Sequence, residues 1–159
     1  MVHIKMPGKI MIAEDLQGNR RINYPLGGFD SQWDDRFFST LFTNAIDPND
    51  NNRNLNQLAD AICHSYHSYI HNRVIYTENH DTIPNDRQKR LPEAIYQGAG
   101  DKNFFAIKRS VLCAGILFTS PGIPMILQGQ ELLETSCPVW PHPPSVDWSR
   151  KSNFRGRDL

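Results

Sequence analysis

The sequence predicts an α/β fold in which helices cover a parallel β-sheet. Four short apolar runs recur along the chain, and three of them are separated by segments with apolar residues at helical spacing. Polar residues follow the carboxyl end of each run. Buried parallel strands have this short, nearly continuous apolar character. Ligands bind at the edge that the carboxyl ends of such strands form.

The first two predicted strands lie close together in the sequence. Residues 9–13 (KIMIA) form an apolar run that ends at acidic residues, and residues 27–33 (GGFDSQW) form a second candidate strand that begins at a glycine pair. Only about a dozen residues link Asp15 to Gly27, which is too short for a full crossover helix. We therefore expect a loop or a single helical turn in this link.

Two amphipathic helices are predicted between the second and third strands. In residues 34–46 the apolar side chains follow helical spacing behind Asp34, whose carboxylate suits the N-cap position. Residues 54–66 repeat the pattern, and the polar residues between the two segments predict a loop.

The second half of the chain repeats the strand and helix pattern. Residues 73–77 (RVIYT) predict the third strand, and residues 123–128 (IPMILQ) predict the fourth. Between them, residues 101–118 are nearly apolar all round in their second half, which predicts a helix buried between layers. The tail from residue 138 is rich in proline and is not expected to form regular structure.

The composition indicates one globular unit without a bias toward charged partners. The 159 residues include 17 basic and 17 acidic side chains, and 39% are apolar, which is enough for one core. The absence of basic runs argues against nucleic acid as a partner. The longest apolar stretch, residues 111–127, is interrupted by two prolines and a glycine, which argues against a membrane span. Three widely spaced cysteines favour reduced thiols in an intracellular protein.

The polar residues at the strand ends include groups suited to acid/base chemistry. Glu14 follows the first strand, and Glu78, Asn79, His80 and Asp81 follow the third. Taken alone, a carboxylate at the end of an element is often only a helix cap. In the same way, His80 and Asp81 could belong to a structural Asx turn.

Five motifs carry most of these residues. They are MIAED (11–15), GGFDSQWDDRFF (27–38), YTENHD (76–81), GIPMILQGQE (122–131) and PSVDWS (144–149). In this order and spacing they resemble the α-amylase superfamily of glycoside hydrolases and look most like 1,4-α-glucan branching enzymes. The resemblance covers nearly the whole chain, from about Lys9 to Trp148.

The resemblance implies a (β/α)8 TIM barrel of which this chain carries strands five to eight with their helices. Residues 1–159 would then be the C-terminal half of the catalytic domain, truncated at both ends. The inward-facing side chains of such a half-barrel, with Ile10, Ile12, Ile75 and Met125 among the candidates, would lack the opposite layer that buries them.

By resemblance, Glu14 is the general acid/base, and Asp81 is a third carboxylate that binds sugar hydroxyls and favours the charged transition state. His80 is expected to hydrogen-bond the same sugar, and Asn79 and Glu78 are further candidates for substrate binding. The family's nucleophile, an aspartate on strand four, would lie upstream of Met1. We therefore expect the isolated chain to be inactive.

The expected activity is a retaining double displacement on α-1,4-glucan, such as glycogen, starch or amylose, with transfer of the cleaved chain to an α-1,6 branch. A hydrolase of the same superfamily is the alternative, and a non-catalytic glucan-binding or interaction protein is the alternative from another class. The expected partners are the glucan and the missing N-terminal half of the barrel. The resemblance implies no cofactor and no metal in this half. The expected location is the cytoplasm, or a plastid if the missing N-terminus carries a transit peptide.

Four further side chains are candidates for the cleft. Trp140 and Trp148 could stack on sugar rings or form a loop plug on the barrel. Gln130 and Glu131, which follow the fourth strand, could support the cleft or simply form a polar cluster at the strand end.

Overall fold

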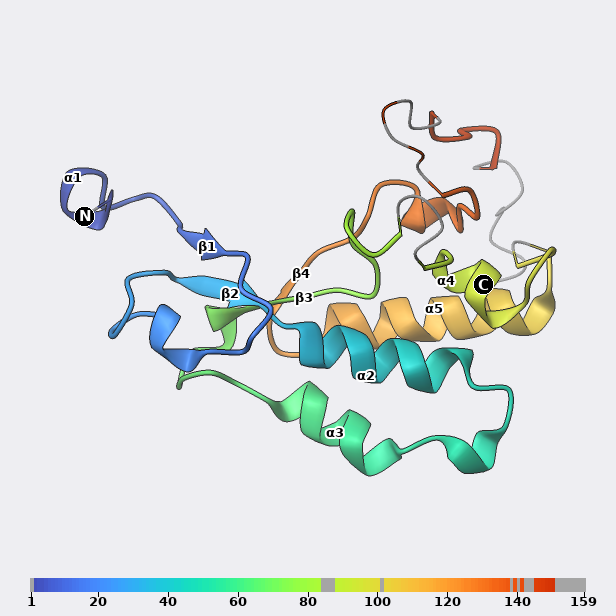
Figure 1. Ribbon diagram of the computed structural model, residues 1–159, viewed down its shortest axis with the longest axis horizontal. Helices are drawn as coiled ribbons and strands as arrows, with labels where there is room; N and C mark the ends of the chain where they lie inside the picture. The colour runs from blue at the N-terminus through green and yellow to red at the C-terminus, as the bar shows by residue number, and fades with distance from the viewer. Residues whose placement is uncertain are drawn as a thin grey trace.

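The computed structural model describes residues 2–83, 88–100, 102–137, 139, 141 and 145–150. Its centre is a four-stranded parallel sheet in which the strands follow one another in chain order (Figure 1). The strands are β1 (Ile12–Ala13), β2 (Ser31–Trp33), β3 (Arg73–Ile75) and β4 (Ile123–Pro124). The predicted α/β class with a parallel sheet is confirmed.

Each strand is shorter than the sequence segment that predicted it. The ladder extends slightly beyond the assigned strands, since the N–H of Asp34 donates to Val74 O at 2.9 Å and the N–H of Met125 donates to Ile75 O at 2.9 Å. Beyond these bonds, the backbone segments that follow the strands turn toward different partners. Apolar side chains therefore continue past the end of the backbone ladder.

Helices connect the later strands. The α-helices are α1 (Val2–Lys5), α2 (Asp35–Ile46), α3 (Leu55–Cys63), α4 (Leu91–Ile95) and α5 (Phe104–Thr119). The 3-10 turns are η1 (Arg20–Ile22), η2 (Asp50–Asn52), η3 (Ile70–Asn72) and η5 (Gln130–Leu132). Between β1 and β2 only η1 is present, as the short link predicted.

The helix starts follow the predicted capping chemistry. The Asp34 carboxylate accepts a hydrogen bond from the N–H of Phe37 at 3.1 Å, so the predicted N-cap of α2 is confirmed. The C-terminal end predicted for α3 is wrong. Helix α3 ends at Cys63 instead of residue 66. The backbone of His64, with φ −60° and ψ 144°, is extended and therefore cannot continue the helix.

The hydrophobic core lies between the sheet and helices α2 and α5. Figure 1 shows α3, α2 and α5 side by side, with α2 in the middle. The buried members of this core are Phe37, Phe38, Leu41, Phe42, Ala45, Ile75, Tyr76, Leu91, Cys113 and Leu117. Ile75 was expected on the inward face, but it is fully buried in this core under the helices. A single alternation step along β3 decides between the two faces.

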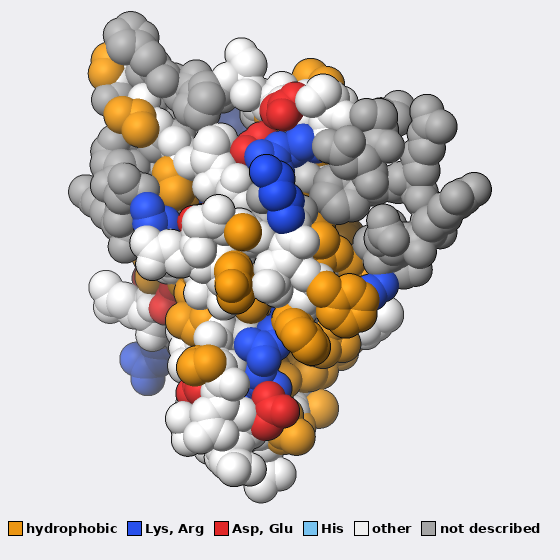
Figure 2. Space-filling view, turned by 90° about the vertical axis from the view of Figure 1, so that its right-hand side faces the viewer, with side chains coloured by type: hydrophobic (Ala, Val, Ile, Leu, Met, Phe, Trp, Pro, Cys, Tyr) orange, Lys and Arg blue, Asp and Glu red, His pale blue; other side chains and the backbone are white. Residues whose placement is uncertain are grey.

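The two outer strands and one helix face leave apolar groups exposed. Ile10 and Ile12 at the β1 edge are 72% and 46% exposed. Figure 2 views the molecule from the N-terminal end of α5 and shows hydrophobic side chains gathered on this face. The exposed large apolar residues of α5 are Phe104, Phe105, Leu112 and Phe118.

In the part of the chain that the structure describes, no helix has both the length and the apolar character that crossing a bilayer requires.

Candidate functional site

The carboxyl edge of the sheet brings three of the predicted site residues together. Glu14 follows β1 directly, and His80 and Asp81 lie in the turn after β3. One carboxylate oxygen of Glu14, one of Asp81 and one imidazole nitrogen of His80 lie within 4.8 Å of one another, and all three residues are exposed. β1 and β3 are not neighbours, because β2 lies between them. Since adjacent strands are about 4.8 Å apart, these side chains converge over the end of β2.

Trp33, at the end of β2, forms an aromatic wall beside this group. Its ring meets the His80 imidazole edge-on, with centroids 5.8 Å apart and an interplanar angle of 88°. It also contacts the buried Tyr76 ring at 5.3 Å. Sequence reasoning did not single out Trp33. The available signal was an aromatic residue at the carboxyl end of a predicted strand, directly before the acidic pair that starts α2.

Asn79 holds the turn that presents His80 and Asp81. Its side-chain Oδ1 accepts hydrogen bonds from the N–H of Asp81 at 2.9 Å and of Thr82 at 2.8 Å. The sequence allowed the interpretation that His80 and Asp81 belong to an Asx turn. Such a turn is present, and the side-chain amide of Asn79 forms it. The side chains of His80 and Asp81 stay 58% and 55% exposed, with His80 Nε2 lying 3.6 Å from Asp81 Oδ1.

Glu78 points into the protein instead of toward the exposed group. Its Oε1 accepts a hydrogen bond from the N–H of Leu91 at 2.5 Å, and its Oε2 lies 2.8 Å from Nε of the buried Arg90. Burial raises the pKa of Glu78 to about 7, and the nearby Arg90 guanidinium and Leu91 N–H oppose a larger rise. This carboxyl therefore joins the end of β3 to the start of α4.

The burial of Glu78 and Asn79 bears directly on their predicted role. Glu78 is fully buried and Asn79 is 3% exposed, and both side chains have partners within the protein. Direct contact with a substrate, as predicted, is at odds with this placement. Asn79 holds the turn that carries His80 and Asp81, whereas Glu78 joins the end of β3 to the start of α4.

Asp34 and Arg73 form a buried ion pair beneath the site. Arg73 Nη1 lies 2.9 Å from Asp34 Oδ2, and both side chains are almost completely buried. The same guanidinium donates to the carbonyls of Ala61 at 2.7 Å and Pro121 at 2.7 Å. It thus ties β3 to the end of α3 and to the turn before β4. Burial, and then the neighbouring Asp34 charge, raise the pKa of Asp35.

The polar residues after β4 have separate positions. Gln130 donates a hydrogen bond to the Thr77 hydroxyl and accepts one from the N–H of Leu127 at 3.1 Å, so it connects η5 to the end of β3. Glu131 is exposed and lines a pocket next to α5. Trp148 is exposed in the tail. Trp140 lies outside the described residues.

Two exposed carboxylates and an imidazole can perform several kinds of chemistry. They can transfer protons, stabilise a developing positive charge and hydrogen-bond to sugar hydroxyls. Carboxylates and imidazole at this spacing are also ligand types for divalent cations, although exposed acidic groups commonly lie together without one.

A scan against known protein families found no matching family model, and a search of curated proteins found no match.

Proposed function

We propose that Glu14, His80 and Asp81 form part of the active site of a retaining α-glucan enzyme of the α-amylase superfamily, with 1,4-α-glucan branching as its reaction. The observation that carries this proposal is the convergence of the three exposed side chains within 4.8 Å at the carboxyl edge of a parallel sheet. In parallel α/β folds this edge is where substrates bind.

In the proposed mechanism, Glu14 protonates the glycosidic oxygen as the bond breaks and later removes a proton from the acceptor. Asp81 carries the negative charge that stabilises the positively charged sugar in the transition state. The His80 imidazole donates a hydrogen bond to a sugar hydroxyl, with its ring supported by Trp33. In retaining enzymes the acid/base and the nucleophile lie about 5 Å apart, so this spacing is expected between Glu14 and the upstream nucleophile, while Asp81 lies beside Glu14 as a third carboxylate.

The proposal also requires a nucleophile, which the resemblance assigns to an aspartate on a strand upstream of this chain. Two features are consistent with further strands beside this sheet. β1 and β4 each have one strand neighbour within the described residues, and Ile10 and Ile12 at the β1 edge are exposed. We propose that these four strands are the second half of a (β/α)8 barrel whose first half supplies the nucleophile.

The outcome of the reaction depends on what reaches the covalent glycosyl intermediate. A sugar hydroxyl gives an α-1,6 branch, and water gives hydrolysis. Debranching the products of amylose and sizing the released chains separates the two. New α-1,6 linkages support branching, whereas only rising reducing ends and short maltooligosaccharides would assign the protein to the hydrolases.

The proposal can be tested on the coding sequence upstream of Met1 and on the protein that it specifies. We expect an open frame that continues into an aspartate-bearing strand. In the joined protein, Glu14→Gln keeps the shape of the side chain but removes the transferable proton, so turnover should fall about 10²–10⁴-fold while glucan binding persists. Asp15→Asn, at the neighbouring carboxylate, is the matched control and should retain most activity.

Two results would contradict this proposal. A Glu14→Gln variant that retained a tenth of the parent rate would exclude the acid/base role. A reading frame that closes directly upstream of Met1, in a protein that binds glucan without turnover, would favour the non-catalytic binding protein.

A further inference from the structure

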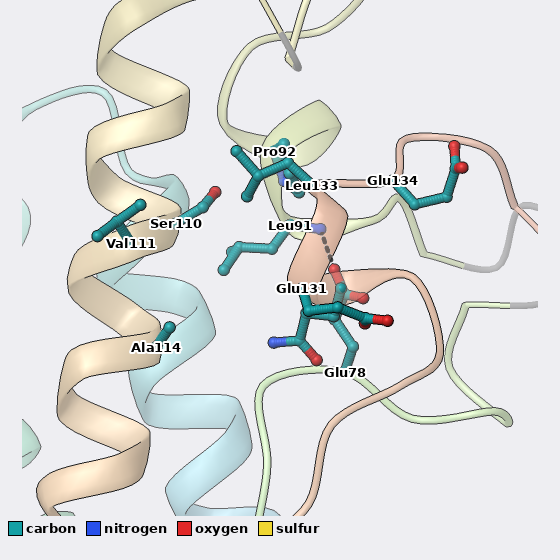
Figure 3. Close-up of a pocket in the computed structure, with 10 residues that line it drawn as sticks. Glu78, Leu91, Pro92, Ser110, Val111, Ala114, Glu131, Leu133 and Glu134 are labelled. Carbon is teal, nitrogen blue, oxygen red and sulfur yellow. Dashed lines mark hydrogen bonds between the residues drawn. The ribbon is translucent and has the colours of Figure 1, made fainter. Parts of the chain in front are cut away.

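A pocket separate from the exposed strand-end group lies between α4, α5 and η5 (Figure 3). Its volume is about 220 Å³. Most of its wall is apolar, with Leu91 and Pro92 on one side, Val111 and Ala114 of α5 on another, and Leu133 near η5. An apolar cavity of about 150 Å³ can hold benzene, so this pocket has room for a ligand of about six or seven non-hydrogen atoms.

The hydroxyl of Ser110 is a buried polar group without a partner at the wall of this pocket. Ser110 is 6% exposed, and its Oγ forms no hydrogen bond among the described residues. At the end of the same helix, the hydroxyls of Thr119 and Ser120 donate to carbonyls four residues earlier, at 2.7 and 2.6 Å. Ser110 makes no such bond, and Figure 3 shows its hydroxyl projecting from α5 toward the loop side. A ligand oxygen can accept this unused donor.

Three glutamates and Gln130 line the rest of the pocket. Glu78 and Glu134 already have cationic neighbours, Arg90 at 2.8 Å and Arg150 at 3.5 Å. Glu131 is exposed and forms no ion pair or hydrogen bond within the described part of the chain. Figure 3 shows Glu131 across the pocket from Ser110. Because Arg90 and Arg150 balance the other two glutamates, the carboxylate of Glu131 favours a cationic ligand and repels an anionic one.

We propose that this pocket binds a small aliphatic amino alcohol. The hydrocarbon chain of four or five carbons packs between α4 and α5, the ligand hydroxyl accepts a hydrogen bond from Ser110, and the ammonium group pairs with Glu131. The site is independent of the proposed glucan chemistry, because Glu14, His80 and Asp81 do not line this pocket.

The test uses 5-amino-1-pentanol as the probe, with three matched compounds. Pentylamine lacks the hydroxyl, 1-pentanol lacks the ammonium group, and 5-hydroxypentanoate reverses the charge. Saturation-transfer NMR on the 159-residue chain measures each affinity, and this method tolerates self-association because the transfer grows with particle size. We expect the amino alcohol to bind about three- to tenfold more tightly than pentylamine or pentanol, and the anion not to bind.

Four variants assign the contacts. Ser110→Ala should bring the affinity of the amino alcohol down to that of pentylamine, and Glu131→Gln should bring it down to that of pentanol. Val111→Phe fills the pocket and should abolish binding of all probes, whereas Leu112→Phe, at an exposed neighbour that does not line the pocket, should leave binding unchanged. If Val111→Phe fails to fold, the variants Ser110→Ala and Glu131→Gln, which do not enlarge a side chain, still test whether the pocket binds the amino alcohol.

Three results would overturn the proposal: no binding of the amino alcohol to the intact chain, equal binding of all four compounds, or affinities that Ser110→Ala and Glu131→Gln leave unchanged. A failure here would leave the proposed glucan site untouched, because that site is tested by turnover and product linkage.

Discussion

At the scale of single residues, one amide side chain determines which groups the site exposes. Asn79 is buried, and its Oδ1 accepts the two N–H groups that begin the turn after β3. Because the turn is held from below, the two following side chains face outward. Asn79 thus affects the exposed group through the position of His80 and Asp81.

Replacement of Asn79 should loosen the site without removing any exposed functional group. Asn79→Ala removes both acceptor bonds, and we expect a loss of about 1–3 kcal/mol in unfolding free energy, together with faster motion of the His80 ring. Urea unfolding and NMR of the His80 imidazole measure these effects. Asn49→Ala, which removes a similar turn bond at an exposed residue, should cost less than 1 kcal/mol. Equal losses for the two variants would refute this role of Asn79.

The buried carboxyl of Glu78 should make the stability of the protein depend on pH. Its pKa rises from the ordinary value of 4.5 to about 7 in the folded chain, mainly because of burial. Between these values the folded state holds a proton that the unfolded chain has released. The contribution of Glu78 to stability is therefore greatest below about pH 4.5 and is lost as the pH rises through about 7.

Urea unfolding at a series of pH values tests this expectation. The Glu78→Gln variant cannot titrate, so the decrease in unfolding free energy between pH 5 and pH 8 should be smaller than in the parent by an amount on the order of 1–3 kcal/mol. An unchanged pH dependence would show that Glu78 stays ionised across this range beside Arg90.

At the scale of elements, β3 is the strand on which the architecture depends. Its first residue, Arg73, reaches the α2 cap through Asp34 and also binds the carbonyls at the end of α3 and before β4. Buried ion pairs contribute little net stability when both partners are present, but removal of one partner leaves an uncompensated charge. Replacement of either Arg73 or Asp34 should therefore disturb the packing of the elements around β3.

We expect Arg73→Met to destabilise the protein by about 3–5 kcal/mol, because Asp34 stays buried and charged. The double variant Arg73→Met with Asp34→Asn should recover part of this loss. Asp50→Asn, at an ion-pair partner that is 80% exposed, is the control and should change stability by less than 1 kcal/mol. Chemical denaturation of the parent, the two single variants Arg73→Met and Asp34→Asn and the double variant gives the coupling energy. A loss below 1 kcal/mol in Arg73→Met would contradict the proposed importance of the pair.

At the scale of the whole molecule, the sheet has two edge strands and an incompletely covered apolar surface. β1 and β4 each pair on one side within the described residues, and apolar side chains at both edges are exposed, including Ile12 and Ile126. Unprotected edges of this kind favour association with further strands. In the proposed barrel, the missing half would occupy both edges.

The 159-residue chain expressed alone should therefore form dimers or larger aggregates and should not act on amylose. Light scattering after gel filtration measures the association. Ile12→Lys should reduce it, since a charge at an edge opposes strand pairing, whereas Leu55→Lys at an exposed position of α3 should not. Addition of the N-terminal half of the barrel should restore some activity. A monodisperse monomer that branches or cleaves amylose unaided would contradict the half-barrel proposal.

Local features of the sequence predicted much of this fold. The alternation of apolar runs and helical spacing predicted the parallel α/β arrangement, and Asp34 was identified as an N-cap because capping depends on residues only three positions apart. The polar residues that directly follow the strands predicted a site at the carboxyl edge of the sheet, and this prediction also depends only on residues that are close in the sequence. Predictions failed where a local pattern had to specify a longer-range outcome, as with the end of α3 and the face occupied by Ile75.

The sequence by itself thus determined the order and type of the elements and the chemical groups at the strand ends, because these depend on periodicity and on near neighbours. Only the tertiary structure decided which of those groups meet and which are buried. Glu14 meets His80 and Asp81 from a distant part of the chain, while Glu78, only two residues before His80, turns inward to Arg90. Burial and long-range pairing depend on the path of the whole backbone, and that path brings Trp33 at the end of β2 to His80 after β3.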